Sequence, residues 1–270
     1  MSRARDALVG ALALAVAACS RGVVPTATLA DAAPGSPAAP TAVSEPRPPG
    51  PPSPSAPPHA AAGAAPAPAP PKDGVYLGRR LATPMSHLGA AWLDRAGRDA
   101  VQKPEHVLDV VGVKAGARVC DFGAGSGYFT VHLARRVGPT GHVFAVDLQP
   151  EMLALLGTKL SREGLSNVTP VLAKASEPSL PKASVDLVLM VDVYHELERP
   201  DLTMAQLREA LAPGGRVAWV EYRAEDPNVT IKPDHKLSLV QIRREAAAAG
   251  YTIERVDESL PQQRIVVLTP

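Results

Sequence analysis

The fold is decided by the stretch Arg118-Val119-Cys120-Asp121-Phe122-Gly123-Ala124-Gly125-Ser126-Gly127, in which a short apolar run ends in a glycine-rich turn. A helical pattern follows, with Phe129, Leu133 and Val137 at spacings of four residues. Glycines let a backbone pass close to a ligand, and the first turn of a helix offers free N–H groups. The stretch therefore predicts a buried strand, a ligand-binding turn and a helix, in that order.

The alternation of strand and helix continues toward the C-terminus. Further strands are predicted at residues 142–146, 168–172, 185–191 and 216–222, and helices at 150–162, 202–211 and 237–249. The run 185–191 is nearly all apolar, as expected of a central parallel strand that is covered on both faces. The last two strands, 251–256 and 264–268, are too close in sequence for a crossover helix, so they should pair antiparallel.

This order of elements predicts the fold class. We expect an α/β, Rossmann-like, doubly wound sheet of seven strands that is mostly parallel and carries an antiparallel C-terminal hairpin. Residues 86–113, which precede the first strand, have a helical pattern. Ligands of such sheets bind at the carboxyl ends of the strands, so the glycine turn marks the expected site.

Composition divides the chain into a folded part and a part that cannot fold alone. Between Pro25 and Pro71 stand 16 of the 29 prolines, together with 15 alanines. So few large apolar side chains cannot offset the ordering entropy, and residues 20–71 are expected to form a disordered Pro/Ala-rich linker. Residues 72–270 remain for one domain, which holds 24 Lys and Arg against 24 Asp and Glu. This neutral balance disfavours nucleic acid as a partner.

The first 19 residues have the pattern of an export signal. Positive residues around Arg3 and Arg5 are followed by an apolar run that is too short to span a bilayer but suits a signal peptide. Its end, Val16-Ala17-Ala18-Cys19, resembles the lipobox of bacterial lipoproteins, in which the cysteine is lipidated. By that resemblance, Ser20 favours the outer membrane and its periplasmic face. The alternative is an alanine-rich start of a cytoplasmic protein.

Two aspartates mark the ends of neighbouring predicted strands. Asp121 places a carboxylate at the turn, where it would repel a pyrophosphate but attract an amino group. Asp147 ends the second strand and can accept hydrogen bonds from two ribose hydroxyls. The turn also departs from the dinucleotide pattern G-x-G-x-x-G, because Gly127 comes one residue early and Tyr128 fills a position that needs a small residue. The alternative is that both aspartates are ordinary turn and helix-capping acids.

Three motifs together resemble the class I S-adenosylmethionine-dependent methyltransferases. Residues 119–129 (VCDFGAGSGYF) look like motif I of that family, 143–147 (VFAVD) like its acidic-loop motif, and 211–215 (LAPGG) like the turn before its fifth strand. The resemblance covers about residues 85–268, including the terminal hairpin. A bacterial subgroup of unknown substrate is suggested by 193–197 (VYHEL), 221–227 (EYRAEDP) and the pair His235-Lys236.

The resemblance implies a binding site for S-adenosylmethionine. Asp121 and the turn glycines would bind the methionine moiety, Asp147 would hold the ribose, and Leu148 would flank the adenine. The acid that many relatives place after the third strand is missing here, which leaves Ser176 as the candidate adenine contact. The expected cofactor-binding set is Asp121, Gly123, Ala124, Gly125, Gly127, Tyr128, Asp147, Leu148, Ser176 and Asp192.

The segment after the fourth strand, 192–196, is expected to face the methyl group of the cofactor. A sulfonium methyl is already electrophilic, so a base is needed only if the acceptor carries a proton. We expect Tyr194 to orient the acceptor, His195 to take its proton, Glu196 to orient or pair with that imidazole, and Glu221 to line the acceptor pocket. Alternatively, Tyr194 packs against the cofactor, the next two residues begin a helix, and Glu221 is a loop-facing acid.

The expected function is methyl transfer to an unidentified, small-molecule acceptor. An export signal conflicts with a cytoplasmic cofactor, which leaves a catalytically inactive, lipid-anchored binding module as the alternative. A nicotinamide oxidoreductase is disfavoured by the glycine spacing and the terminal hairpin. No metal is expected: two cysteines, Cys19 and Cys120, exclude a Cys-based zinc site, and four dispersed histidines lack a ligand spacing, namely His87, His106, His132 and His142.

Overall fold

The buried apolar runs of the sequence form one seven-stranded sheet. The computed structural model describes residues 70–270, in which the sheet has the order β5-β4-β3-β6-β7-β9-β8. Its strands are β3 (Arg118–Phe122), β4 (His142–Asp147), β5 (Val168–Leu172), β6 (Val185–Val191), β7 (Leu211–Tyr222), β8 (Thr252–Asp257) and β9 (Gln263–Thr269). The first five strands pair parallel, whereas β9 pairs antiparallel with both β7 and β8. The predicted fold class, including the hairpin, is confirmed.

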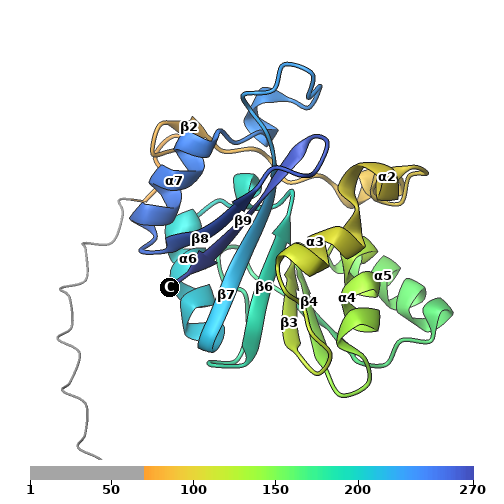
Figure 1. Ribbon diagram of the computed structural model, residues 1–270. Helices are drawn as coiled ribbons and strands as arrows, with labels where there is room; N and C mark the ends of the chain where they lie inside the picture. The colour runs from red at the N-terminus through yellow and green to blue at the C-terminus, as the bar shows by residue number, and fades with distance from the viewer. Residues whose placement is uncertain (1–69) are drawn as a thin grey trace, which may run out of the picture. The chain divides into compact units, whose positions relative to one another are not determined.

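Helices cover both faces of the sheet (Figure 1). They are α3 (Pro104–Val110), α4 (Tyr128–Val137), α5 (Pro150–Glu163), α6 (Pro200–Ala210) and α7 (Leu239–Ala248). The β6 strand shows how the sequence supports this arrangement, because its alternate side chains enter different cores. Leu187 and Leu189 pack with α3 and α4, and Val188 and Met190 pack with α6 and α7. A central strand that is buried on both faces needs the continuous apolar run seen in the sequence.

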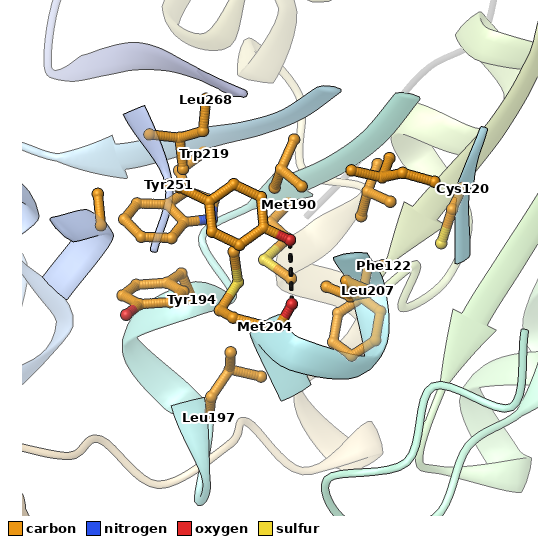
Figure 2. Packing of buried hydrophobic residues seen from close by; sticks show 14 of the residues in the cluster. Cys120, Phe122, Met190, Tyr194, Leu197, Met204, Leu207, Trp219, Tyr251 and Leu268 are labelled. Carbon is orange, nitrogen blue, oxygen red and sulfur yellow. Dashed lines mark hydrogen bonds between the residues drawn. The ribbon is translucent and has the colours of Figure 1, made fainter. Parts of the chain in front are cut away.

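The core beneath α6 is dense in aromatic side chains. Trp219 of β7 stacks on Tyr194 with 3.7 Å between ring centroids, and the Tyr251 hydroxyl donates a hydrogen bond of 3.0 Å to the carbonyl of Met204. Figure 2 shows these side chains together between the sheet and α6. Offset or stacked aromatic pairs contribute about 0.5–1.5 kcal/mol beyond the area they bury. This packing fixes the end of β6 and the residues that follow it.

The segment before β3 is more broken than its helical pattern predicts. It contains a 3-10 turn (His87–Gly89) and three short helices, α1 (Ala90–Leu93), α2 (Arg98–Gln102) and α3. Gly97 and Lys103 adopt left-handed backbone angles, and Pro104 then begins α3. Because Gly97 and Lys103 bound α2 at its two ends and Pro104 starts a new helix, a continuous helix cannot form. A small hairpin of β1 (Val75–Tyr76) and β2 (Arg79–Arg80) precedes this segment and was not predicted.

The predicted signal peptide, residues 1–19, and all but the end of the predicted linker, 20–71, lie outside the described residues. Within 70–270, no helix combines the length and the hydropathy that crossing a bilayer requires. The domain of residues 72–270 is therefore the part of the chain whose function the structure can address.

Candidate active site

A cavity of about 1070 Å³ opens where β3, β4 and β6 end. Strand order reverses between β3 and β6, and ligands of open α/β sheets bind at such a switch point. Nearly all of the predicted cofactor-binding residues line this one cavity: Asp121, Gly123, Ala124, Gly125, Tyr128, Asp147, Leu148, Ser176 and Asp192. The volume lies at the upper end of small-molecule sites, so it can hold more than one ligand.

The glycine turn after β3 is held by both packing and backbone conformation. Gly123 has a φ of 76°, and a Cβ there would lie 2.4 Å from Cγ2 of Val193. Gly127 has a φ of 87°, and its Cβ would lie 2.3 Å from Cδ1 of Leu156 on α5. Gly127 is not among the residues that line the cavity, unlike the other members of the expected cofactor-binding set. It is required because α5 approaches the start of α4 closely.

Asp121 is a buried acid at the start of the turn. The Thr130 hydroxyl donates a hydrogen bond of 2.6 Å to its Oδ2. Burial raises the pKa of Asp121 to about 6, against the opposing effects of Thr130 and the positive Arg98. A buried carboxylate with a raised pKa lacks full compensation of its charge, and so it would bind a cationic amino group favourably.

Asp147 joins the turn to the end of β4. Its Oδ2 accepts a hydrogen bond of 2.8 Å from the backbone N–H of Gly125, and its Oδ1 accepts one of 2.9 Å from Gln149. Each carboxylate oxygen has a second lone pair for a ligand hydroxyl. Leu148, which is 46% exposed, lies beside it at the cavity. These positions agree with the expected contacts to ribose and adenine.

Tyr128 and Asp192 also line the cavity, and both have protein partners. The Tyr128 hydroxyl donates to Asp99. Asp192 has a φ of 57° and accepts hydrogen bonds of 2.8 Å from Gln102 and 2.7 Å from Gln263. Burial, together with the charge of Glu221, raises the pKa of Asp192 to about 6. Asp192 therefore holds α2 and β9 to the end of β6 as well as facing the cavity.

His195 is the predicted catalytic residue that the structure brings to the cavity. Its Nδ1–H donates a hydrogen bond of 2.6 Å to Oε2 of Glu221, and the two side chains are 2% and 0% exposed. Burial alone would lower the pKa of His195, but the charge and hydrogen bond of Glu221 outweigh it and the pKa is raised. Among residues 70–270 the Nε2 atom has no hydrogen-bond partner.

The other predicted catalytic residues do not reach the cavity. Tyr194 is fully buried, stacks on Trp219 and is not among the residues that line the cavity (Figure 2). Glu221 is fully buried behind His195 and does not line the pocket, contrary to expectation. It takes the orienting role that the sequence assigned to Glu196.

Glu196 instead lines the cavity beside a second histidine. Its Oε1 lies 4.0 Å from Nε2 of His195 and 4.0 Å from Nε2 of His235. Burial raises the pKa of Glu196 to about 7. His235 belongs to a 3-10 turn (Pro233–His235), and in the sequence it stands out only as part of the pair His235-Lys236. These side chains form one wall of the cavity, which we call the histidine wall: His195, Glu196 and His235.

The N-terminal segment supplies a part of the site whose individual residues the sequence does not identify. The cavity is also lined by Leu81–Ser86, Trp92 and the buried Arg98. Gln149 fixes this segment, because its side chain accepts a hydrogen bond from the backbone N–H of His87 and donates one to the carbonyl of Met85. No periodic pattern in the sequence relates these N-terminal residues to the strand ends, so their position at the cavity could not be predicted.

Comparisons with known proteins agree with this geometry. Residues 119–215 match the family described as "Methyltransferase domain". The chain is 32% identical over 126 residues to the ubiquinone/menaquinone biosynthesis C-methyltransferase UbiE of Pseudomonas aeruginosa strain LESB58, a match that covers 46% of this chain and 49% of that protein. The chain thus spans about half the length of the curated relatives it matches.

Solved structures give the same result over a longer stretch. A SAM-dependent methyltransferase from Aquifex aeolicus has a TM-score of 0.66 and 28% identity, covering 68% of this chain and 98% of that one. Phosphoethanolamine N-methyltransferase 2 of Haemonchus contortus, in complex with S-adenosyl-L-methionine, shares the fold with a TM-score of 0.53 and 23% identity, covering 64% of this chain and 44% of that one. The described domain thus has the fold of S-adenosylmethionine-dependent methyltransferases, and its residues 119–215 match a methyltransferase domain, which together point to S-adenosylmethionine as the cofactor.

The residues present fit this cofactor. Asp121 offers an undercompensated carboxylate for the amino group, and Asp147 offers two backbone-oriented oxygens for the ribose. Leu148 and Met152 supply apolar surface at the same wall of the cavity. When bound, the cofactor supplies an electrophilic methyl group on a positively charged sulfur.

Proposed function

We propose that the protein transfers the methyl group of S-adenosylmethionine to a small-molecule acceptor that binds against the histidine wall. The observation that carries this proposal is the shared cavity, because Asp121, Asp147 and His195 all line it. A nucleophile must approach the methyl carbon in line and with water excluded. As its bond to the methyl carbon forms, the carbon–sulfur bond breaks and sulfur keeps the electron pair.

The acceptor is proposed to be largely apolar with one ionisable or oxygen-bearing group. Apolar side chains of the cavity that lie outside the cofactor residues include Ala82, Met85, Trp92, Leu197 and Ile231. The polar groups near them include the histidine wall and also Thr83, Glu198 and Lys232. His195 is positioned there by Glu221, so its free Nε2 would receive either a proton of the acceptor or a bound cation.

The test uses the full chain and two ligands. Equilibrium binding of S-adenosylmethionine and of NAD separates a methyltransferase from a nicotinamide enzyme, and we expect only the first to bind. Transfer of labelled methyl into soluble and membrane extracts then tests catalysis. Asp147→Ala serves as the binding-deficient variant, and Asp186→Asn, at the opposite end of β6, as the matched control. Binding without any transfer would favour the inactive binding module over an enzyme.

We further propose that Cys19 is lipidated and anchors the domain in the cell envelope, with the Pro/Ala-rich segment as a tether. The support is the sequence pattern of residues 1–20 alone. Fractionation of bacterial cells that produce the wild type or Cys19→Ser tests the anchor. We expect the wild type with the membranes and the variant in the soluble fraction. A variant that still sediments with membranes through its N-terminus would contradict lipidation.

A further inference from the structure

The histidine wall gathers three metal-ligating side chains at one point of the cavity. One donor atom from each of His195, Glu196 and His235 lies within 4.8 Å of the other two. Two of these separations, from Oε1 of Glu196 to the two Nε2 atoms, are 4.0 Å. A point equidistant from the three donor atoms lies about 2.5 Å from each, compared with about 2.0–2.1 Å for a Zn–N bond. Binding would draw both the turn that carries His235 and the Glu196 carboxylate inward, because tetrahedral ligands at that bond length lie only about 3.3–3.4 Å apart.

His195 is prepared as a ligand independently of that clustering. Its Nδ1–H is held by Glu221 at 2.6 Å, which fixes both the ring orientation and the tautomer. The His195 side chain is only 2% exposed, and its Nε2 atom has no hydrogen-bond partner among residues 70–270. Leaving a buried polar atom unpaired costs about 1–3 kcal/mol. Metal-ligating histidines commonly donate the second ring N–H to a carboxylate, a backbone carbonyl or water, and Glu221 is such a partner.

The charges around His195 also favour a cation. The carboxylates of Asp192, Glu196 and Glu221 are the acidic groups around it. The neighbouring Arg79 is already paired with Glu245 at 2.7 Å and donates to the backbone carbonyl of His195. The cationic Lys236 donates to the carbonyl of Val229. Glu196 thus lies between the imidazoles of His195 and His235 with Glu221 behind the first, and a divalent ion bound there would compensate part of this negative charge.

We propose that His195, Glu196 and His235 bind a divalent transition-metal ion, with an open coordination position toward the cavity. Two imidazoles and one carboxylate form a donor set of catalytic zinc sites, which keep a fourth position for water or substrate. Magnesium and calcium prefer sets made of oxygen atoms, so the two nitrogen donors disfavour them. Zn²⁺ is the ion that suits this set. The four histidines judged dispersed in the sequence are not part of it.

The consequence for catalysis rests on the proposed function. An acceptor oxygen in the open position would lose its proton at neutral pH, because a bound cation lowers the pKa of a coordinated hydroxyl. The resulting oxyanion would attack the methyl carbon, and the proton would leave to solvent. His195 would then act as a ligand, and Glu221 as a positioning residue that holds it.

Metal binding can be tested without the cofactor. The untagged full chain is stripped with a chelator, dialysed, and titrated with Co²⁺, whose visible absorption reports the ligand geometry, and Zn²⁺ is then used as a competitor. We expect one equivalent, and we expect His235→Ala and Glu196→Gln to weaken binding by more than about 100-fold. Glu221→Gln should weaken it by about 10- to 100-fold, as for other groups that support a ligating histidine.

A matched control comes from a second histidine–glutamate pair outside the cavity. His132 lies 2.8 Å from Glu105, and His132→Ala should leave Co²⁺ affinity unchanged. Affinity for S-adenosylmethionine checks that each variant folds, because the cofactor residues are not altered. Retained Co²⁺ affinity in both His235→Ala and Glu196→Gln, or no saturable binding by the wild type, would overturn the proposal. If one of these variants lost methyl transfer but kept its Co²⁺ affinity, the proposed acceptor chemistry would be contradicted, whereas the metal-site proposal would not.

Discussion

Replacement of Asp121 by asparagine should stabilise the unliganded protein while weakening its affinity for the cofactor. The carboxylate is 3% exposed, and its pKa is raised from 3.8 to about 6, chiefly by burial. Asparagine has nearly the same shape, carries no charge and can still accept the hydrogen bond from Thr130. The substitution therefore isolates the charge of Asp121 from its packing.

The magnitude follows from that pKa. A rise from 3.8 to about 6 means that the ionised group costs the folded state about 3 kcal/mol relative to the unfolded chain. Because the pKa is higher in the folded state, stability is fully present below pH about 4 and is lost as the pH rises through about 6. Asp121→Asn should thus be more stable than the wild type by up to about 3 kcal/mol at pH 7.5, or about 6–12 °C in Tm, and by little at pH 4.

Affinity for the cofactor should change in the opposite direction. A hydrogen bond between charged groups contributes about 1.5–3 kcal/mol, so the loss of the carboxylate should weaken S-adenosylmethionine binding by about 10- to 150-fold. Thermal unfolding at two pH values and calorimetric titration measure both effects. Asp186→Asn is the control, because burial there is outweighed by Arg118 and the pKa is lowered, so that variant should lose a little stability and keep its affinity. A less stable Asp121→Asn at pH 7.5, or one with unchanged affinity, would refute this reasoning.

Three further substitutions test the site. Asp147→Ala should weaken cofactor binding by about 1–3 kcal/mol through lost ribose contacts, and unchanged affinity in a titration would remove that assignment. Gly127→Ala should lower the free energy of unfolding by about 1–3 kcal/mol, because its Cβ would lie 2.3 Å from Leu156 and φ is 87°; denaturant titration measures this, and a neutral effect would contradict the packing argument. Tyr194→Phe should leave methyl transfer unchanged, because the hydroxyl does not face the cavity, and a loss of turnover would return Tyr194 to the catalytic residues.

The strands and the cofactor aspartates could be predicted because their signals are local. An apolar run covered on both faces, as in β6, can be recognised without knowledge of its neighbours. Asp121 and Asp147 follow such runs directly, and parallel strands bring their carboxyl ends to one edge. Topology alone therefore places both carboxylates at the same cavity.

The catalytic side of the site could not be predicted residue by residue. Tyr194 and His195 are adjacent, and which of them enters the core depends on the left-handed angle at Asp192 and on the stacking of Tyr194 against Trp219. That contact joins residues 25 positions apart, for which the sequence has no periodic signal. The same holds for Glu221. The role of orienting His195 was assigned to Glu196, the next residue in sequence, whereas Glu221 is the residue that contacts the ring in space.

His235 shows most clearly which part of the site could not be predicted from the sequence. The segment after β7 returns to the sheet through a parallel bridge between Arg223 and Leu237, which brings His235 to 5.1 Å from the His195 ring. Spacing rules for metal ligands assume residues on one element, so they overlook ligands that a long loop brings together. The carboxylates then divide into two groups by the cation each would receive. Asp121 would receive the amino group of the cofactor, whereas the proposed metal ion would compensate the carboxylates of Glu196 and Glu221. For this reason metal binding and cofactor binding should be separable by mutation, even though both proposed sites lie in one cavity.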